Sequence, residues 1–125
     1  MLFRSRELAL LGESREEKGT ETVKLTGKKK DLPGIPMTEL SRDQKDLVKK
    51  VMTDLLAPFR NADSKEAMKL IDKNGFDHLH MAFYKDQDVG KDGVWDVWQI
   101  EGPNMVWFFR GSPHVHVWVN IVANA

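Results

Sequence analysis

Hydrophobic residues recur every three or four positions in the second quarter of the chain, with charged residues between them. Such spacing is typical of a helix that packs one face on a core. Ser41 and Gln44 have the spacing of a capping box, in which each side chain bonds the backbone N–H of the other residue. Because Pro58 cannot continue a helix, the pattern predicts a helix over residues 41–57. Its predicted core-facing stripe consists of Leu47, Val48, Val51, Met52, Leu55, Leu56 and Phe59.

A second, shorter apolar stripe follows, formed by Ala67, Met68, Leu70 and Ile71. We expect this helix to begin at Asp63 or Ser64, because both side chains accept hydrogen bonds from the free N–H groups of a first turn. We expect it to end at Asn74-Gly75, a pair that favours the left-handed conformation after a helix. The two helices together form a predicted helical hairpin.

The hydrophobic period changes to two residues after Gly75, which is typical of strands. Four strands are predicted, over residues 77–84, 94–100, 105–110 and 114–122. The connecting segments are short enough to join antiparallel neighbours. We therefore expect an α+β fold, in which the helical hairpin packs over one face of a four-stranded antiparallel meander.

Residues 1–32 are dense in charge and lack a continuous apolar stripe. This composition predicts that they form an extended or partly ordered N-terminal arm, which depends on contacts with the rest of the protein. Within it, only residues 21–26 alternate like a short edge strand. Pro33 and Pro36 mark a turn that separates the arm from a single α+β domain over residues 33–125, and 125 residues with 41% hydrophobic content suffice for one core.

The charge balance is neutral, with 19 Lys and Arg residues against 19 Asp and Glu residues. No net positive field attracts nucleic acid or an anionic membrane, so neither is expected as a partner. The chain has no cysteine, which excludes disulfides, thiol nucleophiles and thiolate metal sites. No apolar run reaches the length of a signal-peptide core or a membrane span, so no export signal is expected in this sequence.

A series of motifs runs in order through about residues 33–122: Pro33-Gly34-Ile35-Pro36, Leu40-Ser41-Arg42-Asp43-Gln44, Leu55-Leu56-Ala57-Pro58-Phe59, Leu79-His80-Met81-Ala82-Phe83-Tyr84, Ile100-Glu101-Gly102-Pro103 and Pro113-His114-Val115-His116. Together they resemble the C-terminal part of an uncharacterised bacterial family, domain of unknown function 3500. The resemblance implies a strand that ends in a Gly-Pro turn, then a hydrophobic strand and a His-x-His segment. Members of that family are often exported, and the resemblance implies no activity.

The four histidines form two His-x-His pairs, His78 with His80 and His114 with His116. Strand alternation places the two residues of a pair on one face, and neutral imidazoles can bind zinc or a similar divalent ion. The candidate metal ligands are His114, His116, His80 and Asp96. The other interpretation is a hydrogen-bonded polar row, in which His114, His116 and Trp118 share one side of the last strand.

Acid–base chemistry needs a carboxylate or an imidazole in a cleft. Glu101, directly before the Gly102-Pro103 turn, is the candidate carboxylate, with His116 as its catalytic partner. These residues, with a bound metal, support the prediction of a metal-dependent enzyme, in particular a hydrolase.

All four tryptophans lie in the last third of the chain, and Trp98, Trp107 and Trp118 are the candidate ligand-binding residues. Aromatic rings on an open sheet face can stack on a sugar or another small molecule, or contact a protein. The alternative is that they cover the sheet or meet a second subunit. The preferred functional prediction is a binding or interaction module that uses an aromatic and histidine face of the sheet, through a protein partner or self-association; the metal-dependent hydrolase is the alternative.

Overall fold

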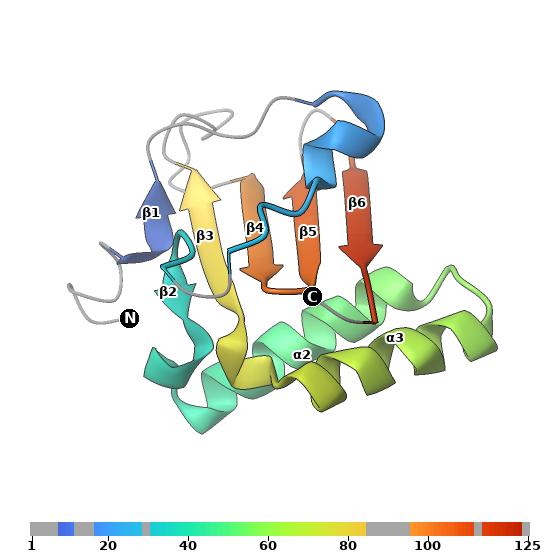
Figure 1. Ribbon diagram of the computed structural model, residues 1–125, viewed down its shortest axis with the longest axis horizontal. Coiled ribbons are helices and arrows are strands. Elements are labelled where there is room, and N and C mark those ends of the chain that lie inside the picture. The colour runs from blue at the N-terminus through green and yellow to red at the C-terminus, as the bar shows by residue number, and fades with distance from the viewer. Residues whose placement is uncertain (1–7, 12–16, 29–30, 85–95, 112–113, 124–125) are drawn as a thin grey trace.

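The computed structural model describes residues 8–11, 17–28, 31–84, 96–111 and 114–123, and it has an α+β fold (Figure 1). The elements in chain order are β1 (Leu10–Leu11), the 3-10 helix η1 (Gly19–Val23), β2 (Ile35–Pro36), the 3-10 helix η2 (Met37–Glu39), α2 (Arg42–Leu56), α3 (Asn61–Asn74), the 3-10 helix η3 (Phe76–His78), β3 (His80–Tyr84), β4 (Val97–Gly102), β5 (Met105–Arg110) and β6 (His116–Ile121).

Helix α2 begins as the sequence predicts. The Gln44 N–H donates to Ser41 Oγ at 3.2 Å, and the Ser41 N–H donates to Gln44 Oε1 at 2.9 Å, so the capping box is complete. Helix α3 begins at Asn61, earlier than predicted. Ser64 does not cap it, because the Ser64 hydroxyl donates to the Leu56 carbonyl at 2.8 Å, an oxygen at the end of α2 that also accepts the Phe59 N–H at 3.0 Å.

The four strands predicted in the last third pair antiparallel in the order β3-β4-β5-β6. In the described residues the sheet has six strands rather than four, because two segments before α2 pair with the outer edge of β3. Strand β2 is antiparallel to β3 and β1 is parallel to it, so the whole sheet is mixed, and the predicted four-stranded antiparallel meander is one part of it. Pairing on this edge satisfies backbone groups that β3 would otherwise leave open.

Residues 21–26 do not form the expected edge strand. Residues 19–23 are the 3-10 helix η1, in which the Lys18 N–H donates to Thr22 Oγ1 at 2.8 Å. A local bond of this kind competes with strand pairing. Thr22 and Val23 are buried against the sheet, and Asn120 Nδ2 donates to the Val23 carbonyl at 3.0 Å.

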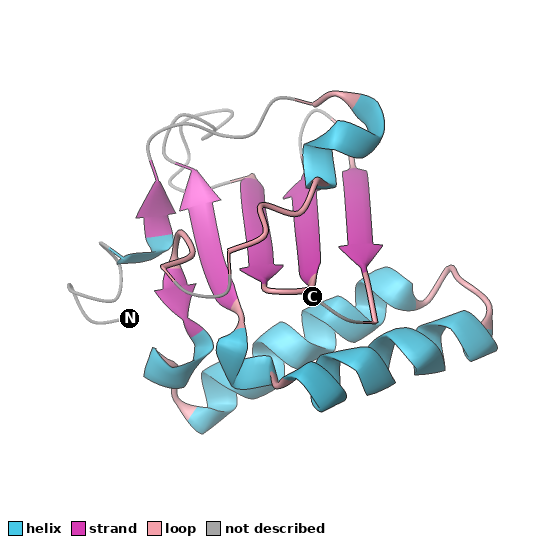
Figure 2. Ribbon diagram, in the orientation of Figure 1, coloured by secondary structure: helices cyan, strands magenta, loops and turns pink. Residues whose placement is uncertain are grey.

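The sheet separates two layers. Helices α2 and α3 run across one end of the strands, and the arm after η1 crosses the other face (Figure 2). The core on the helix side contains Met37, Met52, Leu56, Ile71, Phe76, Leu79, Trp98, Ile100, Met105 and Trp107. A smaller core on the arm side contains Val23, Tyr84, Val97, Val106 and Phe108. Among the described residues, neither helix combines the length and the apolarity that a bilayer span requires.

Candidate functional site

An aromatic row crosses the helix side of the sheet. Phe83, Trp98, Phe109 and Val117 are direct cross-strand neighbours on β3, β4, β5 and β6. The Trp98 and Phe109 rings stack, with centroids 5.1 Å apart and an angle of 15° between their planes. Because side chains alternate along each strand, the next row on this face is Met81, Ile100, Trp107 and Val119, which lies closer to the helices.

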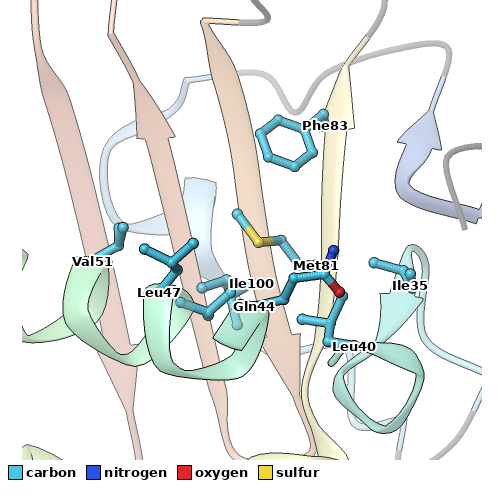
Figure 3. A pocket seen from close by; sticks show the side chains of 9 residues that line it. Ile35, Leu40, Gln44, Leu47, Val51, Met81, Phe83 and Ile100 are labelled. Atoms are coloured by element: carbon cyan, nitrogen blue, oxygen red, sulfur yellow. The ribbon is translucent and has the colours of Figure 1, made fainter. Parts of the chain in front are cut away.

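A groove lies between α2 and these two rows, and we call it the α2 groove (Figure 3). Its volume is about 250 Å³. The lining is hydrocarbon apart from Gln44, whose Oε1 already accepts the Ser41 N–H. It is lined by Ile35, Leu40, Gln44, Leu47, Val48, Val51, Met81, Phe83 and Ile100.

Two apolar side chains at the border of the groove face solvent. Leu47 is 63% exposed and Val51 is 39% exposed, although the helical pattern predicted both as core residues. Helix α2 crosses only one end of the sheet, so the part of its stripe that reaches the core is narrow, and only Met52 and Leu56 are buried. The sequence signal for the groove is therefore an apolar stripe wider than the core requires.

The three candidate ligand-binding tryptophans do not share one face. Trp98 belongs to the aromatic row and is 8% exposed, and Trp107 lies fully buried in the helix-side core. Trp118 packs on the arm side beside Phe108, with ring centroids 5.5 Å apart. One shared platform of these three rings is therefore not present.

His114, His116 and Trp118 lie together on the arm side of β6, as strand alternation predicts. The His114 and His116 ring centroids are 4.5 Å apart, and the Trp118 ring meets His116 edge-on at 5.5 Å. His116 Nδ1 lies 2.6 Å from Arg110 Nη2. Because Arg has only donors, the His116 ring nitrogen is the acceptor in this contact.

Glu17, from the arm, completes this cluster. Arg110 donates to both Glu17 carboxylate oxygens, from Nη2 at 3.1 Å and from Nε, and His116 Nδ1 lies 3.5 Å from Glu17 Oε2. The hydrogen bond from Arg110 lowers the pKa of the Glu17 carboxyl below its ordinary value of 4.5. The arm is thereby attached to the sheet by a charged contact.

The four candidate metal ligands are dispersed. His80 lies on β3 and His116 on β6, with two strands between them, a separation of about 14 Å across the sheet at the usual strand spacing, and register adds an offset of four residues along the strands. His78 lies in the 3-10 helix η3, so strand alternation does not apply to it and His80. Asp96 precedes β4, and its carbonyl accepts the Gly111 N–H at 2.7 Å. Within the described ranges, no group of three His, Cys, Asp or Glu side chains comes together.

Glu101 and His116 are also apart. Glu101 is opposite Val106 on β5, whereas His116 is opposite Arg110, and these two positions are about 13 Å apart along the strand. Glu101 is 1% exposed, and its carboxylate holds the arm by a hydrogen bond instead. Its carboxylate accepts from Thr26 Oγ1 at 3.1 Å and from Gln99 Nε2 at 3.3 Å.

Comparison with known proteins returned no matching family model, no matching curated protein and no matching solved structure. The resemblance to domain of unknown function 3500 accordingly stays a prediction from its motifs.

Proposed function

We propose that this protein is an interaction module that binds the apolar face of an amphipathic helix of a partner protein in the α2 groove. The observation that supports this most directly is the exposure of Leu47 and Val51 beside a preformed apolar groove. An amphipathic helix that enters a hydrophobic groove presents apolar residues at three- and four-residue spacing. Burial of such residues removes the exposed hydrocarbon of both partners from water.

The chemistry of the lining favours a protein segment over a small molecule. Small-molecule sites usually add a few convergent polar groups that fix the orientation of the ligand. Here Gln44 is the only polar lining residue, and its carbonyl oxygen belongs to the capping box. A sugar needs an accessible ring with polar neighbours, whereas the Trp98 ring is almost entirely covered.

No feature of the described residues favours the metal-dependent hydrolase in the same way. His80 is separated from the His114 and His116 pair, and Glu101 is separated from His116. The proposal therefore keeps the predicted interaction module but moves it to the α2 groove, whose lining includes Phe83 and none of the predicted tryptophans or histidines.

The proposal is tested by selecting binders from a displayed library of helical peptides on the wild-type protein. We expect the selected peptides to carry apolar residues at positions i, i+3 or i+4, and i+7. Leu47→Glu is expected to weaken their binding by about tenfold to a hundredfold, or about 1.4–2.8 kcal/mol, because it removes an apolar contact and places a charge against the apolar face of the peptide.

Phe59→Glu is the matched control. Phe59 is also an exposed apolar residue, at 54%, but it lies outside the groove, about 18 Å from Leu47 along the helical direction. Binding that survives in Phe59→Glu and is lost in Leu47→Glu supports the proposal. Equal binding by both variants, or selected peptides without an apolar face, would contradict it.

A further inference from the structure

Strand β6 forms one edge of the sheet. The strand order ends at β6, and no other strand of the described residues pairs with its outer side. In Figure 1 it lies at the margin of the sheet opposite β1 and β2. Strands β1 and β2 cover the edge at β3, so of these two edges only the one at β6 is open.

The hydrogen-bond pattern identifies the backbone groups that face outward. The Val122 N–H donates to the Asn104 carbonyl at 2.9 Å and continues the β5–β6 register. In an antiparallel ladder, alternate residues bond to the same neighbour. His116, Trp118 and Asn120 therefore point their N–H and C=O groups at β5.

The tight turn between β4 and β5 leads to the same assignment. Gly102 pairs with Met105 across a two-residue connection, and such a hairpin is closed by a hydrogen-bonded pair. Odd-numbered residues of β5 consequently face β4, and even-numbered ones face β6. The open groups of β6 thus belong to Val117, Val119 and Ile121, which are all β-branched.

Among the described residues, this edge shows none of the features that usually prevent strand pairing. Exposed edges are commonly protected by Lys, Pro, a bulge or a covering segment. Strand β6 contains no Lys, Arg, Asp, Glu or Pro, and its six pairs with β5 follow without a bulge. Val115 and Val117, beside the edge, are 61% and 38% exposed. The outer side of β6 is therefore suited to adding a strand.

We propose that β6 pairs antiparallel with β6 of a second copy of this chain, about a two-fold axis, so that the two sheets become continuous. A two-fold antiparallel arrangement that uses the open groups pairs odd-numbered with odd-numbered residues, so Val and Ile meet Val and Ile across the interface. It opposes no like charges on β6, and the chain as a whole has no net charge that would make two copies repel each other. A C2 interface of this kind is self-complementary.

The first measurement is the oligomeric state of the full chain by light scattering across a dilution series, with amide hydrogen exchange at the same concentrations. We expect a species of twice the 14.3 kDa chain mass that dissociates on dilution. The amides of Val117, Val119 and Ile121 should be protected in the dimer and exchange faster on dilution, whereas that of Trp118 stays protected in both states. A monomer at every concentration, or a dimer in which the Val117 and Val119 amides exchange fast, would overturn the proposal.

Two matched valine variants distinguish this interface from the α2 groove. Val117 and Val51 have nearly equal exposure, 38% and 39%, so the two lysine substitutions replace side chains that the fold buries to the same extent. Val117→Lys is expected to raise the dimer dissociation constant by about tenfold or more, because it removes apolar contact and places two charges near the axis. Val51→Lys should leave the dimer unchanged and weaken only peptide binding in the groove. Loss of the dimer in Val51→Lys, or its persistence in Val117→Lys, would show that β6 is not the interface.

Discussion

The apolar stripe of α2 is divided into a part that stabilises the fold and a part that serves the groove, and paired alanine substitutions measure this division. Met52 is fully buried, whereas Leu47 is 63% exposed. Met52→Ala leaves a cavity in the helix-side core and is expected to cost about 2–5 kcal/mol of unfolding free energy. Burial of a whole leucine side chain contributes about 1.5–3 kcal/mol, so Leu47→Ala, with about a third of the side chain buried, should cost only about 0.5–1 kcal/mol.

Urea unfolding followed by tryptophan fluorescence measures both losses. We expect the urea concentration at the unfolding midpoint to fall clearly in Met52→Ala and only slightly in Leu47→Ala. The slope of the unfolding free energy against urea should be the same in both variants, since the surface exposed on unfolding is nearly unchanged. Binding of the selected helical peptides should show the reverse order, because Leu47 borders the groove and Met52 does not line it. Equal losses of stability would mean that the whole stripe is core, and the structural basis of the proposed function would then be wrong.

Two further predictions concern the contacts that the segments before α2 make with the sheet. Because Arg110 lowers the pKa of Glu17, the stabilisation from this contact should be complete above the ordinary pKa of 4.5 and disappear as pH falls through the lowered pKa. The difference in thermal unfolding midpoint between wild type and Glu17→Gln should therefore shrink in that acidic range. A difference that stays constant with pH would refute the role of Glu17. Gly34 has φ of +106°, and an added Cβ would lie 2.3 Å from the Met81 carbonyl oxygen. Gly34→Ala should therefore destabilise the protein by about 1–3 kcal/mol and speed amide exchange at Met81. Unchanged urea unfolding would contradict the close approach of Gly34 to β3.

Local patterns in the sequence were sufficient for the elements that depend on local interactions. The capping box of Ser41 and Gln44 and the proline after the helix predict α2 within one residue of its observed bounds. Alternation predicts the strands β3 to β6 and places His116 and Trp118 on one side of β6. In each case the determining contacts lie within a few residues along the chain or follow from the geometry of one strand.

Only the tertiary structure decided which segments meet. The parallel pairing of β1 with β3 depends on a distant partner that no local pattern identifies. The same holds for function: Glu101 and His116 are both polar residues in strands, but register places them about 13 Å apart along the strand direction, on strands separated by β5. An apolar residue on a helix signals burial or binding equally well, and the position of α2 across one end of the sheet is what leaves Leu47 at a groove. The sequence by itself therefore determined the two long helices, the four later strands and their amphipathic faces, whereas the packing of those faces determined which residues form the core and which remain available to a partner.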